Sequence, residues 1–377
     1  MVDKEENLRE SNKLGVGDAF RYARKILYKR KSMPEALIFF VTSKCNARCE
    51  HCFFWKDLNK SKDDLTIGEI KKISSKLGNF SHLFISGGEP FIRKDLPEIV
   101  ETFYRNNHLK SLLIPTNGIL TEKIKKDVDK ICERNPELRL IIDFSLDNLN
   151  EKHDKIRGVP GIFNKLIKSI EEVKGLKKKH KNLNVGTICV FNSKNQDEIY
   201  NIYKFIKEEI RPDSVSFPLI RGDAKNKTYK EVDLGKYEEF CNFLKKEYEK
   251  HVFEGYNNFF LQDFSNFMNV KIREEAHKVA KLNKYRNPCY ACNLIGVIYP
   301  NGDVNCCEIL PTKIGNLREA NYDFKKIWLS ENADKARKFI RKSKCFCTHE
   351  CFMYVNLLFN SRSLASILGK YFLRDKF

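Results

Sequence analysis

Three cysteines near the start of the chain carry the clearest chemical signal. Cys45, Cys49 and Cys52 follow the apolar run 37–41, which has the composition of a buried strand. They therefore lie in the loop at the end of that strand. Three thiolates on one loop can bind three irons of a four-iron cluster, which leaves the fourth iron open to a substrate or cofactor. The alternatives are a zinc site, which needs a fourth ligand, and ordinary buried cysteines.

The segments that must position this loop alternate in character along the chain. Short apolar runs, which predict strands, lie at 36–42, 82–86, 111–115, 139–145, 184–191 and 214–219. Segments of helical periodicity lie at about 66–77, 94–107, 121–133, 160–180, 195–209 and 233–252. Strands that alternate with helices form parallel βαβ units. Six units are too few for a closed eight-stranded barrel, so we expect the α/β class and a partial, TIM-like (βα)6 barrel.

Polar and glycine-rich motifs follow the predicted strands. Gly87–Pro90 follows the second strand, Thr116–Gly118 the third and Arg221 the sixth, while Ser145–Asp147 ends the fourth. Each motif alone could be an ordinary turn. In parallel α/β folds, however, binding and catalytic residues gather at the carboxyl ends of the strands. The three-cysteine loop lies at the same end, so we expect a single site there.

The residue types in these motifs suit a small polar ligand. The glycines at positions 87 and 88 let the backbone approach a ligand closely, and Glu89 adds a nearby negative charge. Arg157 can bind a carboxylate through its guanidinium fork, and Ser145 and Asn117 offer further polar contacts. For Arg157 taken alone, a surface salt bridge of little energetic consequence is the alternative.

Taken together, the motifs resemble the radical S-adenosylmethionine (SAM) superfamily over roughly residues 35–220. The matching motifs are Cys45-x3-Cys49-x2-Cys52 with His51 before its last cysteine, Gly87-Gly88-Glu89-Pro90, Ser145-Leu146-Asp147, His153 to Gly158, and Gly161-x-Phe163. The resemblance implies a 4Fe–4S cluster on Cys45, Cys49 and Cys52, with SAM bound to the open iron. The SAM contacts that we expect are His51, Gly87, Gly88, Glu89, Asn117, Ser145 and Arg157.

This resemblance also implies an enzymatic activity. One electron from a donor such as flavodoxin or ferredoxin cleaves SAM, and the resulting 5′-deoxyadenosyl radical abstracts a hydrogen atom from a C–H bond of the substrate. The cofactor carries this chemistry, while the protein aims the reaction and excludes water.

A second group of cysteines lies near the other end of the chain. Seven cysteines fall within residues 289–351, around a segment, 296–304, that predicts a β-hairpin with Asn301-Gly302 as its turn. The arrangement resembles the SPASM and twitch domains, which carry auxiliary iron–sulfur clusters. We expect one auxiliary 4Fe–4S cluster on Cys289, Cys307, Cys347 and Cys351, with Cys292, Cys306 and Cys345 as substitutes or additions. The last three cysteines, Cys345, Cys347 and Cys351, depart from the SPASM spacing, which argues against a second auxiliary cluster. Zinc is the alternative metal for this group.

Composition limits the class of protein. The chain has 377 residues, 42% of them hydrophobic, with a net charge of +19 and 13 cysteines. The charged N-terminus predicts no signal peptide, and clustered cysteines suit metal ligation in a reducing cytoplasm better than disulfides. No apolar run reaches the roughly 20 residues of a membrane span. The positive charge suits solvated helix faces, an anionic membrane or a phosphorylated substrate, whereas the absence of basic–aromatic stacking platforms argues against nucleic acid.

We divide the chain into five parts by these features. They are a basic amphipathic N-terminal segment, 1–34; the radical SAM partial barrel, 35–252; a helical bridge, 253–287; the SPASM/twitch-like auxiliary cluster domain, 288–351; and a basic amphipathic tail, 352–377. Basic amphipathic helices can lie on anionic lipid. We therefore expect a cytoplasmic protein, with peripheral membrane contact through its two ends as a further expectation.

The expected function is an oxidation or bond-forming modification of an unidentified substrate, assisted by the auxiliary cluster. The basic ends favour a lipid, a lipid-linked sugar or another anionic small molecule. A peptide maturase and a dehydrogenase of a small alcohol or sugar are alternatives within the superfamily. A non-catalytic iron–sulfur or zinc-binding module is the alternative of another class, although such a module has no need of the SAM site that Gly87–Glu89 and Arg157 imply.

Overall fold

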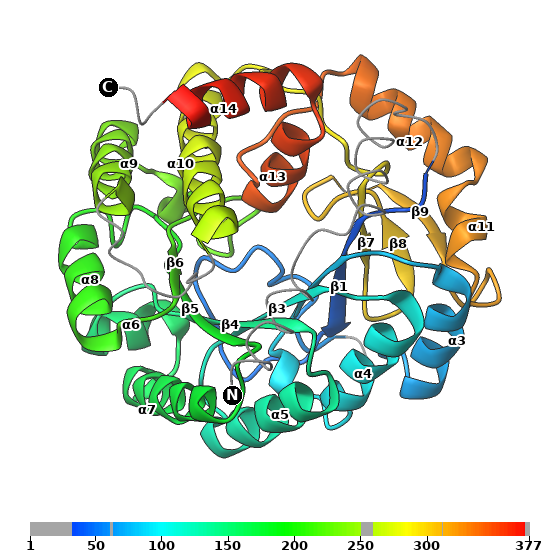
Figure 1. Ribbon diagram of the computed structural model, residues 1–377, viewed down its shortest axis with the longest axis horizontal. Coiled ribbons are helices and arrows are strands. Elements are labelled where there is room, and N and C mark those ends of the chain that lie inside the picture. Colours follow the sequence, from blue (N-terminus) through cyan, green and yellow to red (C-terminus); the bar gives the residue numbers. More distant parts are fainter. Residues whose placement is uncertain (1–31, 61–62, 250–258, 311, 374–377) are drawn as a thin grey trace.

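The computed structural model describes residues 32–60, 63–249, 259–310 and 312–373. Within these residues the strands form one sheet in the order β6-β5-β4-β3-β2-β1-β7-β8-β9 (Figure 1). The bounds are β1 Ala36–Thr42, β2 His82–Gly87, β3 Ser111–Thr116, β4 Arg139–Ser145, β5 Leu183–Ile188, β6 Ser214–Ser216, β7 Ile295–Ile298, β8 Asp303–Asn305 and β9 Lys313–Asn316. Strands β1 to β6 are parallel throughout. The predicted α/β class and partial barrel are confirmed.

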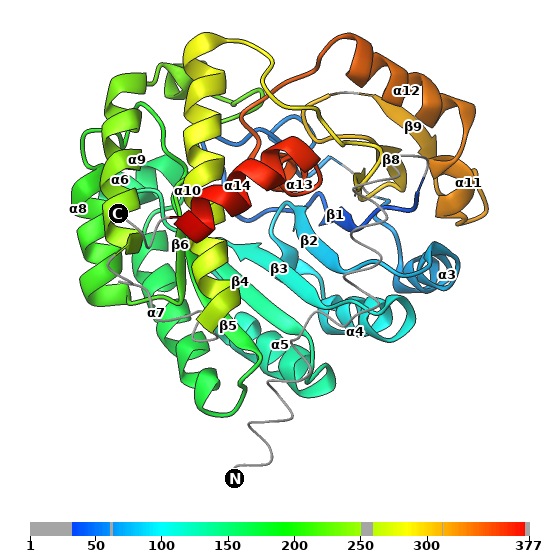
Figure 2. The same ribbon diagram turned by 45° about the horizontal axis from the view of Figure 1, so that its top comes forward.

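Helices that connect these strands surround the outer side of the curved sheet (Figures 1 and 2). They are α3 Ile67–Leu77, α4 Leu96–Asn107, α5 Thr121–Arg134, α6 Asn150–Arg157, α7 Ile162–Gly175 and α8 Ile199–Phe205. Helix α6 was not predicted, because its eight residues bury few apolar side chains and show no apolar period. The helix expected at 195–209 begins later and ends in a π-helical turn, Ile206–Ile210.

Burial along the strands explains their sequence patterns. All seven residues of β1, which lies between β2 and β7 in the sheet, are buried. Strand β3 alternates instead: Leu112 and Ile114 are buried, whereas Leu113 and Pro115 are half-buried. A continuous apolar run is typical of a strand that is covered on both faces. Alternation of apolar and polar residues is typical of a strand that is covered on one face only.

The predicted C-terminal hairpin is present and continues the barrel sheet. Strand β7 pairs in parallel with β1, with Ala36 opposite Ile295, and β8 and β9 follow in antiparallel order. Gly296 allows close packing here, because a Cβ at this position would lie 2.5 Å from the Trp328 ring. Two helices missed by the sequence analysis, α11 Phe324–Trp328 and α12 Glu331–Lys342, lie beside the hairpin.

The remaining helices close the open side of the barrel. They are α9 Leu234–Glu249, α10 Phe259–Leu282, α13 Glu350–Leu358 and α14 Ser361–Leu373, and α13 lies between α10 and the β7–β9 strands (Figures 1 and 2). The tail is thus two helices, where we expected one amphipathic helix. Its Met353, Leu357 and Ile367 pack with Met268 and Ile272 of α10, so these apolar side chains are covered by protein.

The sequence led to two expectations about membranes, namely contact of the basic ends with lipid and the absence of a membrane span. Of the basic N-terminal segment predicted to contact lipid, 1–34, residues 1–31 lie outside the described residues. In the part of the chain that is described, no helix combines the length and apolar character needed to cross a bilayer.

Candidate functional site

The cysteine loop that leaves β1 is fixed by hydrogen bonds at both of its ends. Asn59 binds the backbone of Cys45 twice: its Oδ1 accepts from the Cys45 N–H at 3.0 Å, and its Nδ2 donates to the Cys45 carbonyl at 3.2 Å. Backbone N–H groups at positions 48 and 50 donate to carbonyls at the end of α6, 2.9 and 3.0 Å away. The end of α6 and Asn59, which follows the three cysteines in the chain, therefore fix the conformation of the cysteine loop.

Gly87 and Gly88 lie directly against the start of this loop. Gly87 has a φ of +115°, and a Cβ there would lie 2.3 Å from the Thr42 carbonyl oxygen. A Cβ on Gly88 would lie 2.0 Å from the Lys44 carbonyl oxygen. The N–H groups of Gly88 and Glu89 donate to these two carbonyls at 2.9 and 2.8 Å. The glycines thus let the loops after β1 and β2 pack backbone against backbone.

Glu89 is buried, and three neighbours donate to its carboxylate. Oε1 accepts from Thr116 Oγ1 at 2.9 Å and from the Phe91 N–H at 3.2 Å, and Oε2 accepts from the Asn117 N–H at 2.8 Å. Burial raises the pKa of Glu89 to about 7, and these hydrogen bonds oppose that rise. Asn117 Nδ2 also donates to Asn46 Oδ1 inside the cysteine loop, at 2.8 Å. Glu89 and Asn117 therefore connect the motifs after β2 and β3 to the cysteines.

Arg157 and Asp147 form a buried ion pair beside the loop. Arg157 NH2 lies 2.6 Å from Asp147 Oδ2, and its NH1 lies 3.5 Å from Cys49 Sγ. His51 Nε2 approaches the same carboxylate at 3.5 Å. Burial alone would raise the pKa of Asp147, but the charges of Arg157 and His51 bring it below its ordinary value. Two of the three guanidinium nitrogens of Arg157 are thus directed at protein partners.

The chemistry of the three thiols fits an iron–sulfur cluster. Burial raises the pKa of Cys45 to about 12 and that of Cys52 to about 11, and it also raises the pKa of Cys49, against the opposing charge of Arg157. Iron must therefore displace protons from all three thiols when it binds. Among the described residues, no three His, Cys, Asp or Glu side chains converge closely enough to hold a single metal ion. Cluster thiolates each bind a different iron, so they need not converge on one point.

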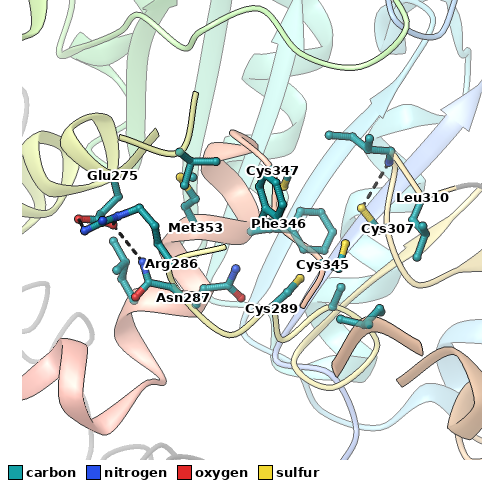
Figure 3. Close-up of a pocket in the computed structure, with 17 residues that line it drawn as sticks. Glu275, Arg286, Asn287, Cys289, Cys307, Leu310, Cys345, Phe346, Cys347 and Met353 are labelled. Atoms are coloured by element: carbon teal, nitrogen blue, oxygen red, sulfur yellow. Dashed lines mark hydrogen bonds and ion pairs between the residues drawn. The ribbon is translucent and has the colours of Figure 1, made fainter. Parts of the chain in front are cut away.

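A cavity of about 110 Å³ lies among the C-terminal cysteines (Figure 3). Cys289, Cys307, Cys345 and Cys347 line it, and apolar side chains such as Leu310 and Phe352 form other parts of its wall. Burial raises the pKa of Cys289 and Cys307 to about 12 and also raises that of Cys345 and Cys347. Four cysteines from three separate segments thus line one small space, and four cysteines are the number of ligands that a 4Fe–4S cluster takes.

The other C-terminal cysteines lie outside this wall. Cys351, one of the four preferred ligands, sits in the first turn of α13 near the charges of Arg221 and Glu308. Cys292 and Cys306 hydrogen-bond to each other instead. The structure therefore brings together three of the four preferred ligands, with Cys345, which we expected as a substitute or an addition, on the same cavity wall.

A second and more open cavity, of about 400 Å³, is lined by the residue that follows Cys52 and by the two residues that follow Cys307. Its lining residues are Phe53, Gly222, Asp223, Lys230, Glu308 and Ile309. Phe53 directly follows Cys52, and Ile309 lines the cavity of the C-terminal cysteines as well. A molecule bound here would contact the segment that follows Cys52 and the segment that follows Cys307. We refer to this space as the central cavity.

The predicted SAM contacts lie around the cysteine loop. Gly87, Gly88, Glu89, Asn117, His51 and Arg157 all contact the loop or belong to its hydrogen-bond and ion-pair network, and Ser145 is half-buried at the end of β4. Sequence reasoning missed the roles of Asn59 and Asp147. Asn59 has a φ of +60°, which asparagine tolerates better than most residues, but asparagines in loops are common. Asp147 stands inside a recognised motif, and the need of a buried arginine for an acidic partner is the signal that could have found it.

Comparison with known proteins gives a consistent result. Residues 39–206 match the family model of the radical SAM superfamily. The chain is 26% identical over 224 residues to the Fe-coproporphyrin III synthase of Methanosarcina barkeri, covering 57% of this chain and 53% of that protein. It is 30% identical over 201 residues to a GTP 3′,8-cyclase of Clostridium botulinum, covering 52% of this chain and 57% of the cyclase. The chain thus spans little more than half the length of these relatives.

A third relative is matched over most of its length. The AdoMet-dependent heme synthase of Methanosarcina barkeri is 27% identical over 322 residues, covering 81% of this chain and 84% of that protein. Among solved structures, anSMEcpe with bound AdoMet gives a TM-score of 0.58 at 18% identity, with 90% of this chain and 97% of that chain covered. Streptococcus suis SuiB bound to S-adenosylmethionine also gives 0.58 at 18%, with 86% and 72% covered. These two likenesses establish the fold.

Proposed function

We propose that the chain binds a 4Fe–4S cluster on Cys45, Cys49 and Cys52, together with SAM, and modifies a substrate held in the central cavity; the match of residues 39–206 to the family model of the radical SAM superfamily supports this. The observation that carries this proposal is the position of that cavity. It lies between the segment that follows Cys52 and the segment that follows Cys307. A substrate there would lie beside both cysteine groups.

When bound and reduced, the cluster and SAM supply the abstraction of a hydrogen atom from an unactivated C–H bond. The residues of this chain position the cysteines that would bind the cluster and exclude water from them. Arg157 stabilises the thiolate of Cys49, and Asn59 fixes the backbone of Cys45. The glycines at positions 87 and 88 let the next loop close over the cysteines.

Aromatic side chains next to the loop support its exclusion of water. Phe40 on β1 lies 4.8 Å from both Phe54 and Tyr299, measured between ring centroids. Phe40 and Phe54 are buried. Phe54 belongs to the cysteine loop and Tyr299 to the C-terminal hairpin turn, so this cluster joins the two cysteine-bearing regions by apolar contact.

We propose that Cys289, Cys307, Cys345 and Cys347 bind one auxiliary 4Fe–4S cluster. Their common cavity supports this set over one that includes Cys351. Such a cluster offers an electron acceptor near the substrate, which favours an oxidation or a bond-forming oxidative modification. Zinc on these thiols is the alternative, and metal analysis distinguishes the two.

The proposed substrate is a small anionic molecule or a lipid-linked sugar. A peptide maturase and a dehydrogenase of a small alcohol or sugar are alternatives of the same superfamily. Contact with a membrane surface loses support in the described tail, because its apolar side chains pack on α10. An electron donor such as flavodoxin or ferredoxin is the partner that the proposed chemistry requires.

The test is SAM cleavage by anaerobically reconstituted protein with dithionite. We expect 5′-deoxyadenosine from the wild type and none from the Cys45→Ala/Cys49→Ala/Cys52→Ala variant. Iron-loaded wild type that yields no 5′-deoxyadenosine would contradict the proposal and favour a non-catalytic iron–sulfur module.

A further inference from the structure

We infer that the exposed side of α12 and the loop after it bind an acidic electron-carrier protein, which exchanges electrons with the auxiliary cluster. This inference rests on the proposed function, because it requires a redox-active cluster on the C-terminal cysteines. We call this surface the basic face. Its six exposed residues are Lys338, Phe339, Arg341, Lys342, Lys344 and Phe346.

The positive charge of the basic face is not balanced by acidic neighbours. Segment 331–344 contains six basic and two acidic residues, and both acidic residues pair within α12. Glu331 Oε1 lies 2.9 Å from Lys335 Nζ, and Asp334 Oδ1 lies 2.9 Å from Arg337 NH1. In the described part of the chain, none of the four basic side chains of the basic face forms an ion pair. Such a surface attracts an acidic partner.

Two exposed aromatic side chains lie among these charges. Phe339 has 54% of its surface exposed and Phe346 has 40%, and no other phenylalanine whose burial is described is exposed. Phe339 shares one side of α12 with Lys338 and Lys342, since positions three and four apart are neighbours on a helix. The helix dipole favours cations in the last turn, which accounts for Arg341 and Lys342 without a partner. It does not account for exposed phenylalanines, which are typical of interfaces.

The basic face is the outer side of the wall around the C-terminal cysteine cavity. Phe346 stands between Cys345 and Cys347 in the chain, and all three residues line that cavity (Figure 3). Ile340 lines it from the buried side of α12, whereas its neighbour Phe339 is exposed. At α12 a single helix, about 10 Å across, therefore separates the cavity from solvent. A carrier bound to the basic face would lie close to the auxiliary cluster.

These features favour a redox protein over a membrane surface. In the proposed oxidation the substrate radical gives one electron to the auxiliary cluster, and an oxidised carrier must accept that electron before the next turnover. Electron-transfer complexes use small interfaces, and complementary charges guide their association. A helix that inserts into lipid needs a broad apolar side, whereas the basic face has two apolar side chains, Phe339 and Phe346. An acidic carrier is therefore the partner that fits.

The experiment measures, by calorimetry, the binding of two acidic carriers, oxidised ferredoxin and oxidised flavodoxin, to the anaerobically reconstituted protein. We expect the wild type to bind at least one of them, and binding to weaken roughly fivefold between about 50 and about 200 mM salt, because salt screens exposed charges. In Lys338→Glu/Lys342→Glu we expect binding at low salt to weaken roughly tenfold or more. In Phe339→Ser we expect roughly threefold weaker binding with an unchanged salt dependence, because only apolar contact is lost.

Lys165→Glu/Lys168→Glu is the matched control, because it makes the same change of charge at two exposed lysines of α7, on the opposite side of the molecule from α12 (Figure 1). Equal weakening in the two double variants would reduce the effect to net charge and overturn the inference, as would no binding of either carrier to the wild type.

A membrane is the competing partner, and sedimentation with phosphatidylglycerol vesicles tests it. Sedimentation that is lost in Lys338→Glu/Lys342→Glu, without carrier binding to the wild type, would overturn the inference and assign the basic face to lipid. Metal analysis of the wild type separates the inference from the proposed function. If about eight irons load and neither carrier binds, only the inference fails, whereas zinc on the C-terminal cysteines means that the proposed auxiliary cluster itself fails.

Discussion

The two cysteine groups of this chain are built in different ways. The first occupies eight consecutive residues, Cys45 to Cys52, and polar contacts fix it, among them the Arg157–Asp147 pair and the double hydrogen bond from Asn59. The second collects Cys289, Cys307, Cys345 and Cys347 from three segments around a small cavity with a largely apolar wall. The spacing of cysteines within one short segment identifies the first group. Which cysteines belong to the second group depends on how distant segments pack together.

The largest expected effect is a loss of iron when the first cysteine group is removed. In Cys45→Ala/Cys49→Ala/Cys52→Ala, we expect iron per chain to fall from about eight to about four, because only the first cluster loses its ligands. Iron and sulfide analysis after anaerobic reconstitution measures this. Complete loss of iron would show that the two groups do not load independently, and the comparison would fail.

The next largest expected effect is a loss of iron when a cysteine of the second group is replaced. We expect Cys345→Ser to lose most of the iron that the triple variant retains, because Cys345 lines the cysteine cavity. Cys351→Ser is the matched control and should retain it, since Cys351 does not line that wall. Iron content and the absorbance of the cluster are the measurements, and the reverse order of the two variants would contradict the proposed ligand set.

Arg157→Gln tests the polar support of the first group. It leaves the fully buried Asp147 without its ion-pair partner, so we expect a loss of about 3–5 kcal/mol in the free energy of unfolding. Urea denaturation of the metal-free protein measures it. The control is Arg105→Gln, which removes the exposed pair with Glu101 and should cost less than about 1 kcal/mol. Similar losses in both variants would mean that the buried pair gives no special support.

The smallest expected effect concerns Asn59. Asn59→Ala removes two hydrogen bonds to the backbone of Cys45, and we expect a loss of about 1–2 kcal/mol in the free energy of unfolding. We also expect a chelator to remove iron from the first group faster, while the second group keeps its rate. Ser75→Ala, an exposed change on α3, serves as the control, and equal chelation rates at both groups would count against the assigned role.

The sequence predicted the local features well. Short apolar runs located the strands of the partial barrel, and segments of helical periodicity located most of the helices between them. The cysteine loop and Gly87–Gly88 could be recognised because their spacing is fixed by short-range backbone contacts. Helix α6 was missed, because its polar sequence is stabilised by contacts outside itself.

The features that depend on distant segments could not be predicted in the same way. The sequence favoured Cys351 over Cys345 as a ligand, whereas the folded chain places Cys345 on the cavity wall and Cys351 in the first turn of α13. The contact of Arg157 with Cys49 likewise joins two residues that are 108 positions apart in the chain.

One measurement tests the central claim most directly: the metal content of anaerobically reconstituted wild-type protein, with 5′-deoxyadenosine assayed in the same sample after adding SAM and dithionite. The account predicts about eight irons per chain, no zinc, and formation of 5′-deoxyadenosine. About four irons together with zinc, or full iron loading without 5′-deoxyadenosine, would contradict it.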